Sequence, residues 1–243
     1  MKRVIALLLI TLFATSCDDD DSNNTNNNNN TLISETASSI AFTPGQYSPD
    51  AMRFTTEVTI TLLDDAGNPV AGKAVLPVTD MADSTFDPEM AVSDDQGVAT
   101  FTMSTVHTGV ATLSAQVSRD DQAPGEGAVT LDATGAPQFE FSVDVIPLDV
   151  TYNPESAEFS LRATLEDGVD IISTGELTVQ DASGLITFPE SELTTDGNGR
   201  VVFTAQTPVA GTSSLIFSLA GIMESIVVPF NFAGQSIAGQ IAN

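Results

Sequence analysis

The sequence predicts an all-β protein built from two tandem β-sandwiches, and three observations support this prediction. Apolar and polar residues alternate in short segments, turn-forming residues separate these segments, and one stretch of the chain occurs twice. Short strands with turn signals at intervals of about 8–12 residues are typical of a β-sandwich. Beyond the first 30 residues, no segment combines sustained helical periodicity with helix caps.

The clearest strand signal lies at residues 58–62, where Val, Ile and Leu alternate with Thr. This alternation predicts a strand with one buried face. Residues 64–69 (Asp-Asp-Ala-Gly-Asn-Pro) then supply a turn, because Asp and Asn bond to the local backbone, Gly accepts a positive φ and Pro fixes φ. Similar turns at 94–97 and 196–199 each precede a further apolar segment, so we expect strands from residues 98 and 201.

The repeat sets the domain organisation, because a repeated segment indicates repeated units of structure. Residues 85–117 align without a gap with residues 187–219, and nine of the 33 aligned positions are identical. In the first copy these positions are Thr85, Phe86, Asp94, Gly97, Phe101, Thr102, Thr105, Gly109 and Leu113. We therefore predict one sandwich at 38–135 and a second at 136–234, joined near residues 134–137, with a C-terminal tail at 235–243.

Composition supports a globular protein that avoids nucleic acid. The chain has 243 residues, 42% of them hydrophobic, which is enough for a packed core, and a formal net charge of −26. Beyond Lys2 and Arg3, the basic residues are Arg53, Lys73, Arg119, Arg162 and Arg200. So acidic a surface repels phosphates and anionic lipid headgroups, which argues against nucleic acid as a partner.

Residues 1–16 have the features of a secretory signal peptide. A positive start at Lys2 and Arg3 is followed by an apolar run at 4–13 and by the small residues at 14–16. The apolar run is too short to cross a hydrocarbon core of about 30 Å, which takes a helix of roughly 20 residues. We expect an export signal that is removed from the mature protein.

The segment Ala14-Thr15-Ser16-Cys17 resembles a bacterial lipobox, although Ala14 stands where leucine is usual. The resemblance implies that Cys17 is acylated, with chains such as palmitate, and becomes the N-terminus of an anchored lipoprotein. Cys17 is the only cysteine, so it forms no internal disulfide. Each buried CH₂ of the lipid contributes about 0.8 kcal/mol to membrane binding. The alternative is an ordinary signal peptide with an incidental cysteine.

Residues 17–37 predict a disordered tether. Asp18–Asp21 repel one another, and the Ser/Asn/Thr tract at 22–31 has no apolar surface to bury. The acidic run resembles the lipoprotein export signals of some Gram-negative lineages, which implies an outer-membrane protein displayed on the cell surface. In enteric-type sorting, by contrast, Asp directly after the cysteine implies retention at the inner membrane. We favour the surface.

Three motifs of the first copy resemble the bacterial Ig-like domains of invasin and intimin. They are Asp65–Gly72 (DAGNPVAG), Ser93–Ala99 (SDDQGVA) and Gly109–Leu113 (GVATL). The second copy keeps Thr195–Gly199 (TDGNG) but has only Glu166–Asp170 (EDGVD) at the first motif, so it is a divergent member. Over residues 40–232, the resemblance implies two Ig-like sandwiches in a stalk or adhesin, with a protein or glycan as possible ligand.

Residues suited to catalysis are scarce. His107 is the only histidine, which excludes a zinc site built from several histidines. A catalytic triad would need a carboxylate and a nucleophile around it. We expect His107 at a strand end or loop without a catalytic role, and we expect no enzyme.

Calcium is the one metal that the sequence suggests. Asp94, Asp95, Asp196 and Asn198 offer the hard oxygen ligands that calcium prefers, but without the spacing of an EF-hand loop. Asp, Asn and Gly are also the residues that tight turns require. We interpret these four as turn residues, keep weak calcium binding as the alternative, and predict no other cofactor.

Two functional hypotheses remain in front. The first is a lipid-anchored cell-envelope protein, displayed on the surface as a structural or adhesive module. The second is a binding or assembly subunit of an envelope complex that faces the periplasm.

Overall fold

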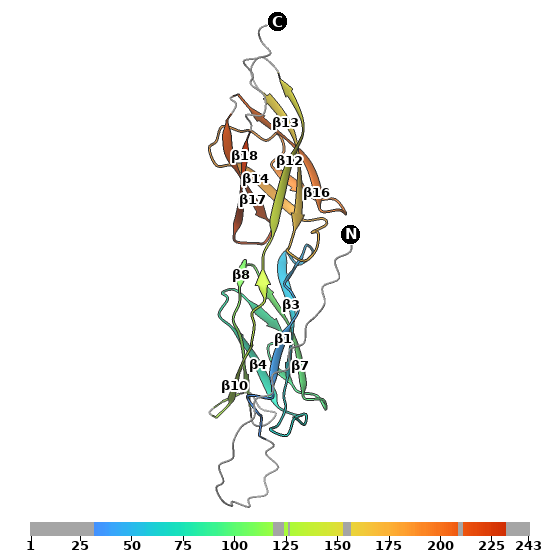
Figure 1. Cartoon of the computed structure of the whole chain (residues 1–243), viewed down its shortest axis with the longest axis vertical. Helices are drawn as coiled ribbons and strands as arrows, with labels where there is room; N and C mark the ends of the chain where they lie inside the picture. Colours follow the sequence, from blue (N-terminus) through green and yellow to red (C-terminus); the bar gives the residue numbers. More distant parts are fainter. Residues whose placement is uncertain (1–31, 119–123, 126, 153–156, 209–210, 232–243) are drawn as a thin grey trace, which may run out of the picture. The chain divides into compact units, whose positions relative to one another are not determined.

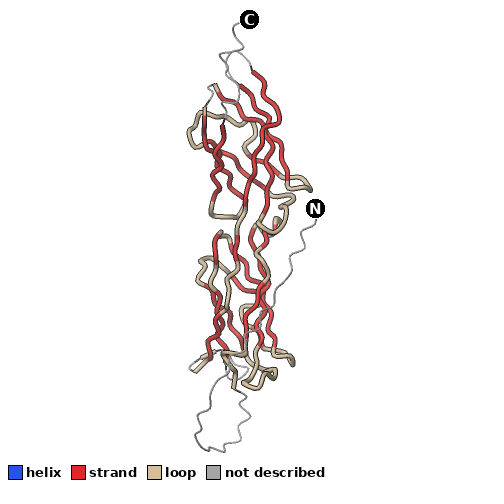
Figure 2. Tube along the Cα trace, in the orientation of Figure 1, coloured by secondary structure: helices blue, strands red, loops and turns tan. Residues whose placement is uncertain are grey.

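The computed structural model describes residues 32–118, 124–125, 127–152, 157–208 and 211–231. These belong to one compact unit, residues 31–243. The described residues form strands and no helix, which confirms the predicted all-β class (Figures 1 and 2). Accordingly, the described part has no helix long and apolar enough to cross a membrane. The predicted signal peptide, Cys17 and most of the predicted tether lie outside the described residues.

The first sandwich consists of two main antiparallel sheets. One has the order β1-β3-β7-β5, with β2 also paired to β3, and the other has the order β10-β9-β4-β6. A short pair of β8 and β11 closes one end. The strands are β1 (Ser39–Phe42), β2 (Gln46–Ser48), β3 (Arg53–Thr61), β4 (Ala74–Thr79), β5 (Thr85–Asp87), β6 (Ala91–Val92), β7 (Val98–Thr105), β8 (Gly109–Val110), β9 (Leu113–Val117), β10 (Val129–Asp132) and β11 (Gln138–Phe139).

The second sandwich has the same plan with fewer strands. Its sheets have the orders β12-β13-β16 and β15-β14-β17-β18. The strands are β12 (Ser142–Tyr152), β13 (Ala157–Glu166), β14 (Glu176–Asp181), β15 (Glu192–Thr194), β16 (Arg200–Thr207), β17 (Thr212–Leu219) and β18 (Ser225–Asn231).

The strand orders are those of immunoglobulin-like sandwiches. The sheet β1-β3-β7-β5 follows the A-B-E-D order and β10-β9-β4 the G-F-C order. In the second sandwich, β12-β13-β16 gives A-B-E and β18-β17-β14 gives G-F-C. The D strand therefore forms as β5 in the first sandwich only.

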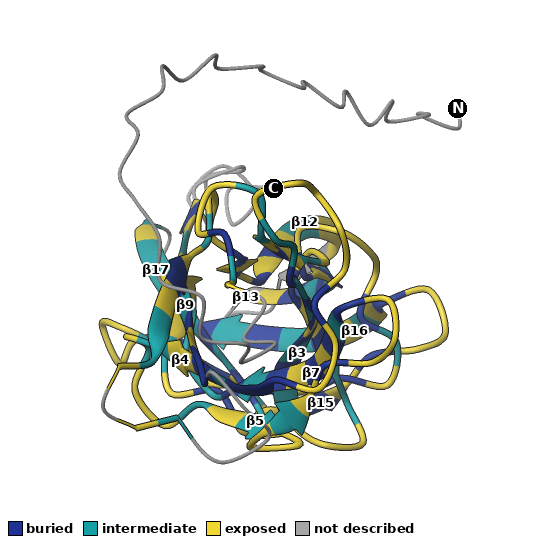
Figure 3. Cartoon of the chain, turned by 90° about the horizontal axis from the view of Figure 1, so that it is seen from below, coloured by how far each residue is buried: buried dark blue, intermediate teal, exposed yellow. Residues whose placement is uncertain are grey.

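The core lies between the two sheets of each sandwich, where alternate residues of every long strand point inward. Along β3, Phe54, Val58 and Ile60 are buried, and Val58 and Ile60 belong to the alternation that predicted a buried face here. In the second sandwich, the buried rings of Phe203 and Phe217 meet edge to face, with centroids 6.1 Å apart. Viewed along the molecule, the buried residues lie inside and the exposed loops lie outside (Figure 3).

The repeated segments fold alike. Strands β7 and β16 are exact counterparts in the alignment, and each follows a turn organised by an aspartate. Asp94 Oδ1 accepts hydrogen bonds from the N–H groups of Gln96 and Val98, both at 2.9 Å. Asp196 Oδ1 accepts them from Asn198 and Arg200, at 2.8 and 3.0 Å. The turn chemistry expected from the sequence is therefore present in both copies.

The limits of the first sandwich differ slightly from the predicted 38–135. Strand β11 pairs with β8, and the buried ring of Phe139 lies 6.0 Å from that of Phe54, so the first sandwich continues through Phe139. At the other end, Ser34 is buried and donates its N–H to the carbonyl of Leu63. The sequence did not predict either limit, because the local residues there are small or polar. Pairing with a distant strand, and not local composition, holds the segments around Ser34 and Phe139 in the sandwich.

Comparing the turn glycine Gly199 with Gly184 tests the packing around Gly199, because both glycines have a similar positive φ. Gly199 and Gly184 have positive φ values of 66° and 71°, so alanine at either position costs about 1–2 kcal/mol. A Cβ at Gly199 would also collide with Ile171 Cγ2 and lie 2.9 Å from the Leu165 carbonyl, whereas Gly184 faces open space. We expect Gly199→Ala to lower the free energy of unfolding by about 2–5 kcal/mol in total, since overpacking adds roughly 1–3 kcal/mol to the backbone cost. Urea unfolding measures both variants, and equal losses would contradict the packing at Gly199.

Candidate functional site: the junction between the two sandwiches

A hydrogen-bonded polar site joins the two sandwiches. From the first sandwich come strand β2 and residues 106–108, which follow β7. From the second come the loop 167–170, which follows β13, and the turn 220–224, which joins β17 to β18. Hydrogen bonds connect these segments in two places, one around Tyr47 and one around His107.

Tyr47 makes the first set of contacts. Its hydroxyl donates to the carbonyl of Ala220 at 2.8 Å, and its backbone N–H donates to Asp167 Oδ2 at 2.9 Å. The ring is only 8% exposed and meets Phe54 edge to face at 5.7 Å, which fixes its direction. Burial, with a smaller contribution from the charge of Glu176, raises the pKa of Tyr47 to about 12, so the hydroxyl keeps its donor proton.

Asp167 serves both the junction and its own loop. While Oδ2 accepts from Tyr47, Oδ1 accepts from the N–H groups of Val169 and Asp170, at 3.1 and 2.9 Å. Asp170 in turn accepts from Gln46 Nε2 at 3.2 Å. The buried carboxylate thus ties the loop after β13 to strand β2 of the other sandwich.

His107 makes the second set of contacts, with a carboxylate on each side of its ring. Nδ1 lies 2.7 Å from Glu224 Oε1 in the second sandwich, and Nε2 lies 3.3 Å from Asp83 Oδ2 in the first. Glu224 Oε2 also accepts from the N–H of Thr108 at 2.8 Å, and Met223 N–H donates to the carbonyl of Val106 at 2.9 Å. Backbone and side-chain groups of residues 106–108 therefore both bind the turn at 220–224.

The two carboxylates favour the imidazolium form of His107. A neutral imidazole has one N–H, whereas both ring nitrogens here face an acceptor. Hydrogen bonds to Glu224 and then Asp83 outweigh desolvation and raise the pKa of His107 above its ordinary value. Burial raises the pKa of Glu224, but hydrogen bonds from His107 and Thr108 outweigh this effect and lower it overall.

A glycine allows the close approach of the two sandwiches beside Tyr47. Gly221 has a φ of 74°, and a Cβ at this position would collide with the carbonyl oxygen and Cβ of Met52. Met52 itself has a φ of 51°. Both residues adopt left-handed backbone where the turn after β17 meets the turn after β2.

His107 lies between Asp83 and Glu224 and forms ion pairs with both, and the pair with Glu224 connects the two sandwiches. The sequence placed it at a strand end or loop, and it lies just after β7. A triad histidine needs a hydroxyl or thiol at Nε2, and this position faces Asp83 instead. The arrangement suits holding two domains in register and offers no proton abstraction from a nucleophile.

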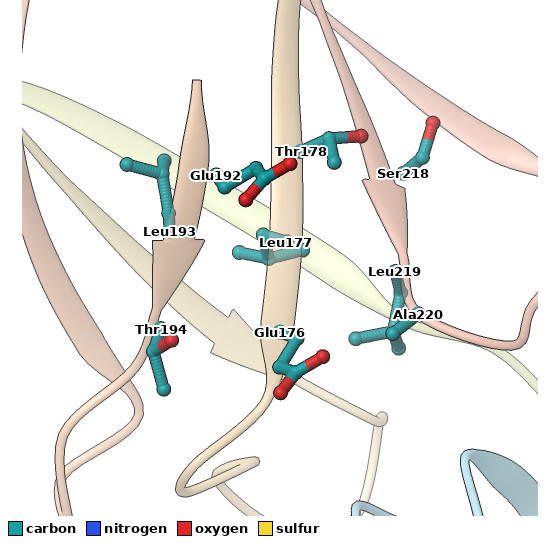
Figure 4. A pocket seen from close by; sticks show the side chains of 9 residues that line it. All are labelled: Glu176, Leu177, Thr178, Glu192, Leu193, Thr194, Ser218, Leu219 and Ala220. Atoms are coloured by element: carbon teal, nitrogen blue, oxygen red, sulfur yellow. The ribbon is translucent and has the colours of Figure 1, made fainter. Parts of the chain in front are cut away.

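A hollow of about 530 Å³ borders the junction on the sheet of β14, β15 and β17 (Figure 4). Its lining comprises Glu176, Leu177, Thr178, Glu192, Leu193, Thr194, Ser218, Leu219 and Ala220. The carbonyl of Ala220 is the group that accepts from Tyr47. The lining offers carboxylates and hydroxyls without an imidazole, a thiol or a cation, and the Ser218 hydroxyl lies 2.7 Å from that of Ser225.

The four calcium candidates lie on the exposed turns before β7 and β16. Asp94 and Asp196 direct one oxygen each to the backbone of their own turns, while Asp95 and Asn198 are their exposed neighbours. Within the described ranges, no group of three or more His, Cys, Asp or Glu side chains is arranged to hold a metal ion. Weak calcium binding stays the alternative to the turn interpretation. Lipidation of Cys17, which lies outside the described residues, stays a prediction.

Sequence reasoning did not find the junction. Asp83, Glu224 and Asp167 are far apart in the chain, and acids are common everywhere in it. One signal was present: within the repeat, His107 aligns with Val209, so the sole histidine occurs in the first copy only.

No protein-family model and no curated protein matches the chain. Among solved structures, it is similar to the Yersinia pseudotuberculosis adhesin InvE, at 21% identity and a TM-score of 0.31, over 84% of this chain and 61% of that one. It is also similar to a C-terminal intimin fragment in complex with the translocated intimin receptor, at 14% and 0.38, over 84% and 64%. For the Escherichia coli adhesin FdeC the values are 16% and 0.29, over 84% and 66%.

The chain thus spans less than two thirds of the length of each of these three structures. Likeness at this level concerns the fold alone.

The sole histidine makes the junction directly measurable by NMR, because its ring protons are a single set of signals. We expect a His107 pKa above 6.5 in the native chain, since both neighbouring carboxylates favour the charged ring. Glu224→Gln should lower this pKa more than Asp83→Asn, because the contact of His107 with Glu224 is shorter, at 2.7 Å against 3.3 Å. A native pKa at or below 6.5 would contradict the arrangement.

Stability should follow the same ion pair. The contribution of His107 to the free energy of unfolding is complete below its unfolded pKa and is lost as pH rises through its raised folded pKa. The contribution of Glu224 is complete above its unfolded pKa and is lost as pH falls through its lowered folded pKa. Relative to His107→Gln, the native chain should gain up to about 1 kcal/mol between these limits, because the pair is partly exposed. Denaturant unfolding of both chains from pH 4 to 9 measures this difference, and a difference that grows above pH 8 would refute it.

Proposed function

We propose that the protein is a lipid-anchored cell-envelope protein, displayed at the cell surface as a structural or adhesive Ig-like module. The observation that carries the proposal is Cys17, the sole cysteine, which directly follows a basic start, an apolar run and three small residues. Acylation gives such an isolated cysteine a role that disulfide formation does not.

The junction supports a presenting role. Domains in one chain usually move relative to one another unless their interface restrains them. Here hydrogen bonds at two separate places, around Tyr47 and around Glu224, restrain both tilt and rotation. A module that holds a binding surface in a set direction from its anchor benefits from such a restraint.

Charge and composition narrow the class of partner. With a net charge of −26, the chain repels phosphate-rich partners, so we propose a protein or glycan ligand. The hollow beside β14 has no grouping that would activate a nucleophile, and His107 is engaged by two carboxylates. We therefore favour binding over catalysis.

The second candidate is a periplasm-facing binding or assembly subunit of an envelope complex. Asp18 favours it, because Asp directly after the lipidated cysteine acts as a retention signal in enteric-type sorting. The two candidates share the anchor and differ in the face of the membrane on which the sandwiches lie.

Lipidation is tested by metabolic labelling with radioactive palmitate. The native chain should incorporate label and Cys17→Ser should lose it entirely, while the matched variant Ser16→Ala, which keeps a small residue before the cysteine, should retain it. Label that persists in Cys17→Ser would refute the anchor.

Surface display is tested by protease treatment of intact cells. We expect the sandwiches to be lost from intact cells. A chain that is protected until lysis and is then crosslinked stoichiometrically to an envelope protein would favour the periplasmic candidate instead.

A further inference from the structure

We infer that the outer edge of strand β16 is a docking site for an extended, acidic segment of a partner protein, which adds to the sheet as a further strand. The inference gives the adhesive part of the proposed function a location and rests on that function only for access to a partner. It follows from the loss of the D strand in the second sandwich.

The ladder at this edge stops after one residue. Strand β16 is the last strand of the sheet β12-β13-β16, and on its outer side only Thr187 forms a bridge, to Gln206. Thr187 and Gln206 exchange both backbone hydrogen bonds, at 2.9 and 2.8 Å. The N–H and C=O groups of Gln206 therefore point away from β13.

Backbone direction alternates along a strand, so the same groups of Thr204, Val202 and Arg200 also point outward. Arg200 is already engaged, because its carbonyl accepts from Asp196 N–H at 2.7 Å and its N–H donates to Asp196 Oδ1. No backbone hydrogen bond within the described part of the chain reaches the outer side of Val202 or Thr204. These two residues present an open edge.

The first sandwich closes the equivalent edge. There Thr85, Phe86 and Asp87 form β5 and pair with β7, so that Asp87 lies opposite Thr102, the counterpart of Thr204. Pro189 takes the place of Asp87 in the second copy. Proline has no N–H to donate, so the ladder ends before it reaches Thr204.

A groove of about 180 Å³ follows the open edge. Pro189, Glu190, Val202, Phe203 and Thr204 line it. Val202 is 56% exposed and is a large apolar side chain next to unpaired backbone. Strand addition uses this combination, with backbone bonds for affinity and side-chain pockets for specificity.

Charge selects the partner. The segment from β12 to β18, residues 142–231, contains two basic residues, Arg162 and Arg200, in a chain with a net charge of −26. Arg162 lies opposite Val202 across the β13–β16 pair, and Arg200 lies two residues before Val202 on the same face. Arg162 Nε is buried and has no hydrogen-bond partner among the described residues. An acidic side chain on an added strand would meet both guanidinium groups.

A second copy of this chain is the less suitable occupant. Pairing β16 with β16 would bring together two chains that each have a net charge of −26, and it would place Glu190 of each groove near the other. A short partner segment with glutamate or aspartate at alternate positions brings far less negative charge than a second chain, and its carboxylates can pair with Arg162 and Arg200.

The test uses the full chain with Cys17→Ser, which carries no lipid, so its result is independent of the anchoring proposal. The probe is a capped decapeptide of alternating Thr and Glu, and the matched control has Lys in place of Glu. We expect the Glu peptide to shift the amide NMR signals of Val202 and Thr204 and to bind at least tenfold more tightly than the Lys peptide.

Three variants separate the two parts of the site. Pro189→Asp restores the residue of the first sandwich, lets the chain's own segment cover Thr204, and should weaken binding at least tenfold. The pair Arg162→Gln and Arg200→Gln should weaken it similarly and reduce its dependence on salt. Asp87→Asn keeps the β5 ladder of the first sandwich and should leave binding unchanged.

Equal binding of the Glu and Lys peptides, or shifts that map to other strands, would overturn the inference. So would binding of full strength in both Pro189→Asp and the double arginine variant. Concentration-dependent self-association that Pro189→Asp abolishes would assign the edge to a second copy and overturn the acidic partner.

Discussion

Burial of one face of the central strands is the constraint on which the rest of the structure depends. In each sandwich, alternate residues of β3 and β7, or of β13 and β16, point into the core, where Phe54, Phe101 and Phe203 are almost completely buried. Since strand periodicity is two, a shift of register by one residue would expose this face. The aspartate turns before β7 and β16 fix that register, and the glycines that end them have no room for a side chain.

The junction depends on this core, because the sheets set the positions of its groups. The ring of Tyr47 is oriented by Phe54, a core residue, and its hydroxyl and backbone N–H then reach two different segments of the second sandwich. Glu224 adds a carboxylate that receives both a side chain and a backbone N–H. The Tyr47 hydroxyl keeps its proton throughout the physiological pH range, whereas the His107 imidazole titrates near it, so the junction combines a constant hydrogen-bond donor with a titratable one.

The two copies show how small changes alter the use of one fold. Asp87 in the first copy allows a third ladder residue, and Pro189 in the second does not, so one sandwich has a covered edge and the other an open one. The two arginines of the second sandwich lie on the sheet beside that edge. Edge strands are usually covered or charged to prevent unwanted pairing, and here Glu190 and Arg200 provide charge while Val202 stays exposed.

The sequence by itself determined the all-β class, the repeat and the turns at Asp94 and Asp196, because these depend on local periodicity and on backbone preferences of single residues. It also supplied the prediction for Cys17, which rests on a local pattern and lies outside the described residues. Only the tertiary structure decided that Phe139 belongs to the first sandwich, that Asp83 and Glu224 enclose His107, and that Thr204 has a strand on one side only. Each of these depends on groups more than 15 residues apart in the chain, whose approach is set by sheet pairing and core packing and leaves no periodic pattern in the sequence.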